Sequence, residues 1–296
     1  MLIKSKLFLS NFRVPFVPIF LLFLSIFLGS CGGNLFQLTA KKDTTEAVYQ
    51  DMKVALNNLD YDTAISKALE LQTKDSSFYL KCEKIDGMKI CPREDLAGAY
   101  ASKCGLNFVT FVSSLTSSSG SPFLFFMQKF KSVTITPAMC YEAQKVIETF
   151  GADSTSRTTE QNLFMAILGM AKMGTYLRDA ADQDQDGSAD STYDSCSSDV
   201  DPNTSAKGIS EEYLRQVVSG MGLVIDNLAS VTAALSGGSS ALTALETIKN
   251  TCGAACSITD PNSSSFNPTV TRNLLKSSDQ GIETSSGCTF PCVVCL

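Results

Sequence analysis

Apolar residues recur every three or four positions along most of the chain from residue 43 onward, and this spacing constrains the fold more than any other feature. The first run begins at Asp43, which has Glu46 three residues later in the pattern of a helix capping box. Side chains spaced in this way lie on one face of a helix and bury that face against a neighbour. No alternating strand pattern occurs outside one short hairpin. The sequence therefore predicts an all-α fold, an irregular bundle of helical hairpins.

Start signals place the other expected helices. Thr158 and Gln161 form a second capping-box pattern, and Pro92 and Pro137 stand near first helical positions. Ser210 is a good N-cap, and the long apolar stripe that follows it is expected to continue without a break to residue 235. Helices are predicted at about residues 43–59, 61–71, 92–104, 108–115, 136–150, 158–177, 210–235 and 242–248.

Composition removes several classes of function. The chain has 296 residues, no His and a formal net charge of −6. His is the commonest general base and the usual partner of Ser and Cys nucleophiles, so most nucleophilic mechanisms are excluded. The negative charge disfavours nucleic acid as a partner. The carboxylates of Glu142, Glu148 and Glu160 show no paired spacing, and we therefore expect a protein that is not an enzyme.

The N-terminus has the pattern of an export signal. Three basic residues, Lys4, Lys6 and Arg13, precede an apolar segment at 14–28 that is shorter than the ~20 residues of a membrane span. The segment ends in Leu28-Gly29-Ser30-Cys31. It resembles the bacterial lipobox, which implies cleavage by signal peptidase II before Cys31. The resemblance also implies diacylglycerol and acyl lipid on Cys31, and hence attachment to a lipid bilayer.

This resemblance sets the expected location and domain boundaries. Gly32 after the lipidated Cys implies sorting to the outer membrane of the bacterial cell envelope. We expect a signal peptide at 1–30, a lipid anchor and tether at 31–42, a helical domain at 43–256 and an irregular Cys-rich tail at 257–296. The alternative is a plain signal peptide or signal anchor in which Cys31 is incidental.

Cysteine usage agrees with export. Eleven cysteines are present, so ten remain besides Cys31, an even number that favours disulfides outside the cytosol. The turn signal Asp86-Gly87 predicts a β-hairpin in which Cys82 lies opposite Cys91, with Cα atoms ~4.5 Å apart. We therefore predict a Cys82–Cys91 disulfide. The C-terminal clusters, Cys252 with Cys256 and Cys288 with Cys292 and Cys295, are expected to form structural disulfides, with zinc or a redox pair as alternatives.

Two segments resemble pieces of tetratricopeptide repeats. Residues 60–71 resemble the second helix of a repeat, and residues 96–100 followed by Gly105 resemble the first helix and its turn. The resemblance covers about sixty residues without a regular ~34-residue period. It implies grooves between helical hairpins that hold an envelope protein partner. The alternative is a pocket for a small apolar ligand in the Phe-rich region of Phe123, Phe125, Phe126 and Phe130.

One acidic segment has the pattern of a metal-binding loop. It runs Asp182-Gln-Asp184-Gln-Asp186-Gly187-Ser188-Ala-Asp190 and resembles the Asp-rich calcium loops of EF-hand, dockerin and thrombospondin type. The resemblance implies a structural calcium ion bound by oxygen ligands. Tyr193 stands where an EF-hand has a bidentate Glu, so we expect Asp194, one position later, or Asp199 and Asp201 to complete the site. The alternative is an acidic, solvated loop. The predicted ligands are Asp182, Asp184, Asp186, Ser188, Asp190 and Asp194.

Overall fold

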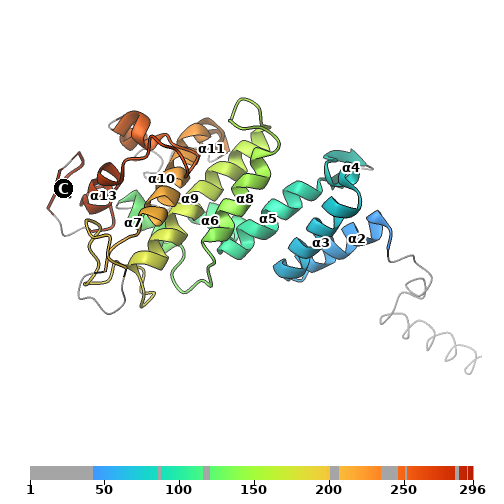
Figure 1. Cartoon of the computed structure of the whole chain (residues 1–296), viewed down its shortest axis with the longest axis horizontal. Helices are drawn as coiled ribbons and strands as arrows, with labels where there is room; N and C mark the ends of the chain where they lie inside the picture. Colours follow the sequence, from blue (N-terminus) through green and yellow to red (C-terminus); the bar gives the residue numbers. More distant parts are fainter. Residues whose placement is uncertain are drawn as a thin grey trace, which may run out of the picture.

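The computed structural model describes residues 43–85, 88–115, 121–200, 207–234, 246–250, 252–283, 287–291 and 293–295. These residues form helical hairpins stacked along one long axis, with α2 near one end and α13 near the other (Figure 1). The predicted all-α class is confirmed. The predicted signal peptide, Cys31 and tether lie outside the described residues, as do Asp86-Gly87 and part of the expected helix at 242–248.

The first hairpin pairs α2 (Thr45–Asn57) with α3 (Tyr61–Lys74). The cap predicted at Asp43 is wrong by one residue, because the side chain of Thr44 accepts the hydrogen bond from the Ala47 N–H that begins α2. The side chain of Asp60 caps α3 by accepting a hydrogen bond from the Thr63 N–H. A short helix, α4 (Ser76–Tyr79), follows. These helices enclose a small core of their own, completed by Leu96 and Ala99 of α5. Its helix-borne members include Val48, Tyr49, Met52, Ala64, Ala68, Leu71 and Phe78.

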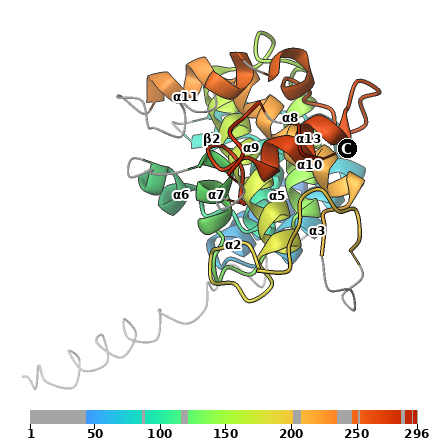
Figure 2. The same ribbon diagram turned by 90° about the vertical axis from the view of Figure 1, so that its left-hand side faces the viewer.

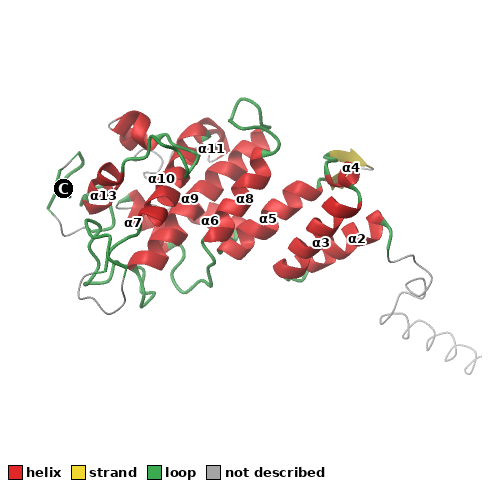
Figure 3. Cartoon of the chain, viewed as in Figure 1, coloured by secondary structure: helices red, strands yellow, loops and turns green. Residues whose placement is uncertain are grey.

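One antiparallel hairpin interrupts the helices, and it contains the only strands named among the described residues (Figure 3). Strand β1 (Glu83–Ile85) pairs with β2 (Met88–Ile90) so that Glu83 faces Ile90 and Ile85 faces Met88. A disulfide joins Cys82 to Cys91, whose Cα atoms are 4.1 Å apart. The structure therefore joins the pair that the hairpin register predicts.

The second hairpin pairs α5 (Pro92–Cys104) with α8 (Ala138–Glu148), and the disulfide Cys104–Cys140 joins them. Helix α5 ends at Gly105, whose φ of 114° is favourable only for glycine. Two short helices, α6 (Phe108–Ser114) and α7 (Pro122–Gln128), lie in the connection. The sequence analysis did not assign α7. It begins at Ser121, which accepts a hydrogen bond from the Leu124 N–H, and it packs against α9.

The third hairpin pairs α9 (Thr159–Ala181) with α10 (Glu211–Asp226), and α9 lies inside the molecule among α7, α8 and α10 (Figure 2). The predicted capping box of Thr158 and Gln161 is formed. Two glycines let the helix backbones approach closely. A Cβ atom on Gly220 would lie 2.7 Å from the Gly169 carbonyl oxygen, and a Cβ on Gly169 would clash with the Gly220 carbonyl oxygen.

The prediction of one unbroken helix at 210–235 is wrong, because the helix is interrupted at one residue. The chain forms α10 and then α11 (Leu228–Ala234), with a break at Asn227. The Asn227 side chain donates to the Leu223 carbonyl (2.7 Å) and accepts from the Arg157 guanidinium (3.3 Å). A side chain that bonds a helix carbonyl in this way competes with the continuing backbone ladder.

The tail at 257–296 was expected to be irregular, but it contains α13 (Pro268–Lys276), and the 3-10 turn η4 (Gly253–Cys256) comes just before the tail. The sequence does contain a start signal for α13, because Asn267 caps the helix and Pro268 is its first residue. The polar composition of the surrounding tail obscured this signal. Leu274 and Leu275 anchor the helix in the core. The disulfide Cys196–Cys295 ties the end of the tail to the loop after α9, and Cys288 of the tail is also disulfide-bonded. A further disulfide, Cys252–Cys256, closes the turn just before the tail.

Across the described residues, no helix has both the length and the hydrophobicity needed to span a membrane.

The close approach of α9 and α10 predicts a graded response to added methyl groups. We expect Gly169→Ala and Gly220→Ala to lower the free energy of unfolding by about 1–3 kcal/mol, because each Cβ meets a backbone carbonyl. Gly98→Ala in α5 is the matched control, since its Cβ meets no atom within 4 Å. The control should be neutral or stabilising by up to ~1 kcal/mol. Urea denaturation measures all three, and equal effects at all positions would contradict the packing.

Candidate functional site

A cavity of about 510 Å³ lies between α5, the start of α6 and the first turns of α9. Helices α5 and α9 are the first helices of two successive hairpins, so the cavity follows the groove between hairpins. Most of its lining is apolar. The lining residues are Glu94, Asp95, Gly98, Ala101, Ser102, Leu106, Phe108, Ile147, Glu160, Gln161, Leu163 and Phe164. This set is called the α5–α9 groove below.

Two features give the groove its apolar wall. Phe108 stacks on Phe164, with ring centroids 6.4 Å apart and planes 7° from parallel. Gly98 leaves one face of α5 open, because a Cβ atom there would meet nothing within 4 Å. The groove therefore offers aromatic surface on one side and room for a side chain on the other.

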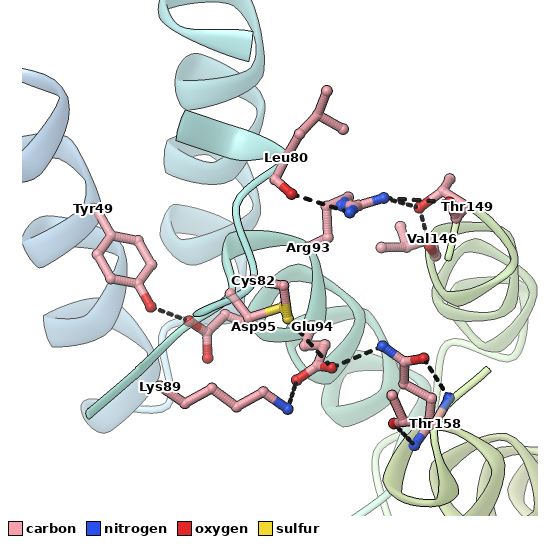
Figure 4. The surroundings of a disulfide bond; sticks show 12 residues. Tyr49, Leu80, Cys82, Lys89, Arg93, Glu94, Asp95, Val146, Thr149 and Thr158 are labelled. Carbon is pink, nitrogen blue, oxygen red and sulfur yellow. Dashed lines mark hydrogen bonds and ion pairs between the residues drawn. A yellow bond between two sulfur atoms is a disulfide. The ribbon is translucent and has the colours of Figure 1, made fainter. Parts of the chain in front are cut away.

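Carboxylates line the edge of the groove near the hairpin disulfide (Figure 4). Glu94 accepts hydrogen bonds from Gln161 (3.0 Å) and pairs with Lys89 (2.6 Å). Asp95 pairs with Lys53 (2.8 Å) and accepts the Tyr49 hydroxyl (2.7 Å). Burial, followed by this hydrogen bond to Asp95, raises the pKa of Tyr49, which stays a neutral donor.

Glu160 differs from the other two carboxylates. It is exposed and has no cation within ion-pair distance among the described residues. Hydrogen bonds from its own backbone N–H and from Thr158 hold its pKa below the ordinary value, so it is ionised at neutral pH. Lys89 and Lys84 lower this pKa further from beyond ion-pair distance, so the edge of the groove carries a negative charge at the N-terminus of α9 that these lysines balance only in part.

The Phe-rich region lies elsewhere. Phe123, Phe125, Phe126 and Phe130 are all at most 3% exposed and belong to the main core. They pack against α9 rather than around a ligand cavity, and the apolar cavity forms from α5, α6 and α9 instead. Sequence reasoning missed Phe108 and Phe164 as groove residues, because only the packing of distant helices brings the two rings together.

The second candidate site is the Asp-rich loop that follows α9. Asp182, Asp184 and Asp190 each offer one carboxylate oxygen, and these oxygens lie within 4.8 Å of one another. Gly187 has a φ of +89°, which allows the chain to fold back, and its N–H donates to Asp182 Oδ2 (3.1 Å). The Asp190 N–H donates to the Ala181 carbonyl (2.7 Å), which holds the end of the loop against the end of α9.

Asp182 is the most informative of these residues. It is only 1% exposed, and its Oδ1 has no hydrogen-bond donor. Burial raises the pKa of Asp182, with the neighbouring Asp184 and Asp186 adding to the effect. A buried carboxylate oxygen without a donor is costly unless a cation lies beside it, so the donor set fits a hard divalent metal such as calcium.

The other predicted ligands lie around this cluster. Asp186 accepts a hydrogen bond from the Ser188 N–H (2.7 Å), and neither residue belongs to the three-carboxylate group. Asp194 lies apart and pairs with Lys276 of α13 (2.9 Å), which lowers its pKa. Lys276 also pairs with Glu283 (2.6 Å), so Asp194 holds the loop to the tail. Asp201 lies outside the described residues.

No family model, curated protein or solved structure matches this chain.

Proposed function

We propose that this protein is a lipid-anchored lipoprotein of the bacterial cell envelope that binds a segment of a protein partner in the α5–α9 groove. The observation that carries the proposal is the 510 Å³ apolar cavity between the first helices of two successive hairpins. The lipobox-like segment ending at Cys31 supports the anchor. The absence of His and the lack of paired carboxylate spacing support a non-enzymatic role.

The chemistry of the groove indicates what the partner segment contains. Phe108, Phe164 and the open face at Gly98 fit one bulky apolar side chain. Glu160, which forms no ion pair among the described residues, fits a Lys or Arg next to that side chain. A small apolar ligand is the competing occupant, and the charged edge favours the basic peptide segment over it.

We further propose that the Asp-rich loop binds calcium through Asp182, Asp184 and Asp190. The observation that favours this is the buried, unpaired Oδ1 of Asp182. Calcium prefers six to eight oxygen ligands, so backbone carbonyls and water would complete the coordination. The bound ion would neutralise the carboxylates and hold the loop on the end of α9, which is a structural role.

The groove proposal is tested with a displayed library of random peptides selected on the full chain. We expect enriched peptides to carry a bulky apolar residue beside Lys or Arg. Gly98→Leu should abolish their binding because the added side chain fills the cavity. Val54→Leu on the exposed face of α2 is the control and should bind normally. No enrichment, or enrichment that Gly98→Leu leaves unchanged, would refute the groove as the binding site.

The calcium proposal is tested by thermal unfolding in calcium and in chelator. Calcium at about 100 times its Kd should add about 2.7 kcal/mol of stability. Asp184→Asn should abolish this gain, whereas Asp51→Asn on the exposed face of α2 should keep it. Asp182→Asn should be at least as stable as the parent in chelator, because it removes a buried unpaired charge, but less stable in calcium. A parent with the same melting temperature in both conditions rules the site out.

A further inference from the structure

A lysine lies in the centre of the main core. Lys172 of α9 is fully buried, and its Nζ donates to Gln144 Oε1 of α8 (2.7 Å) and Ser219 Oγ of α10 (2.8 Å). The Tyr141 ring covers it at 4.9 Å. Among the described residues, Glu148 and Asp260 act on this amine electrostatically, but neither forms an ion pair with it. A buried ammonium without a counter-ion is costly, so this position calls for an explanation.

Burial favours the neutral amine. It lowers the pKa of Lys172 to about 7, against opposing electrostatic effects from Glu148 and Asp260. A large share of the side chain is therefore uncharged at neutral pH. A neutral amine held in a dry site is a nucleophile.

The amide that faces this amine is fixed on both sides. Gln144 is fully buried, and its Nε2 donates to Glu148 Oε1 (2.7 Å) and to the Thr259 carbonyl (3.0 Å). Its Oε1 faces Lys172, with Ser219 Oγ also 3.5 Å away. The site thus brings together the nucleophile, the acyl group and a carboxylate at the leaving nitrogen, and the Ser219 hydroxyl beside them donates to the Thr259 carbonyl.

We propose that Lys172 and Gln144 form an intramolecular isopeptide bond that joins α9 to α8. Lys172 Nζ attacks Gln144 Cδ, and the Ser219 hydroxyl, which lies 3.5 Å from Oε1, turns from the Thr259 carbonyl to stabilise the negative charge that develops on Oε1. Once the new bond has formed, Nζ and Nε2 are attached to the same carbon, so Glu148, whose Oε1 is 2.7 Å from Nε2, carries the proton that Nζ loses to Nε2. The Cδ–Nε2 bond breaks and ammonia leaves, so one C–N bond replaces another and no oxidant or other reactant is needed.

The bond accounts for the position of the lysine. An amide carries no charge, so its formation removes the cost of the buried ammonium. The disulfide Cys104–Cys140 already joins α5 to α8. The isopeptide bond would extend this covalent path to α9, so that the three helices around the core are linked in series.

Mass spectrometry of the reduced, unfolded full chain tests this directly. The expected mass is lower by one ammonia than that of the same processed chain without the cross-link, and a tryptic digest should contain residues 132–145 covalently joined to residues 158–178. This peptide pair separates the cross-link from ammonia loss elsewhere. Recovery of both segments as separate linear peptides, with cleavage after Lys172, overturns the proposal in the wild-type protein without any variant.

Variants then assign the atoms. Lys172→Arg should lack the mass loss, and Gln144→Glu should lose one water in place of ammonia, because its leaving group is hydroxide. Lys145→Arg is the matched control, since Lys145 lies over the same Tyr141 ring (5.1 Å) but is exposed, and it should cross-link fully. Glu148→Gln should slow the cross-link. Complete cross-linking in folded Glu148→Gln protein would remove Glu148 from the reaction.

Discussion

The burial of α9 is the constraint on which the rest of the structure depends. Of its 23 residues, 17 are buried, so neighbouring elements must cover it on nearly every side. Helices α7, α8, α10 and α11 supply that cover, and the Gly169–Gly220 contact lets α10 pack closely on α9. The two candidate sites lie at opposite ends of this one helix. The groove uses its first turns, and the Asp-rich loop begins at its C-terminus.

This arrangement explains how a helical hairpin stack provides both a groove and a fixed loop. Glu94 accepts a hydrogen bond from Gln161, the residue that also completes the capping box of α9. The edge of the groove is therefore tied to the start of α9 and, through Lys89, to the β-hairpin. At the other end, the Asp194–Lys276–Glu283 contacts and the Cys196–Cys295 disulfide tie the loop to the tail.

Features that depend on neighbouring residues could be predicted from the sequence, whereas features formed by residues far apart in the chain could not. The Thr158 capping box, the turn at Gly105 and the Cys82–Cys91 pairing each depend on a few neighbouring residues, and the structure contains all three. The break at Asn227 depends on Arg157, which is far away in the chain. The Cys104–Cys140 disulfide, the Phe108–Phe164 stack and the environment of Lys172 likewise form only after distant helices pack.

The first hairpin has a core of its own, and α5 links it to the core around α9. If the structure depends on the burial of α9, the core around α9 should open at a higher free energy than the core of the first hairpin. Native-state hydrogen exchange measures this most directly. We expect amides in the middle of α9 to exchange only through global unfolding, and amides of α2 to exchange through a smaller opening at lower free energy. Exchange from α9 at a lower free energy than from α2 would contradict the central place of α9.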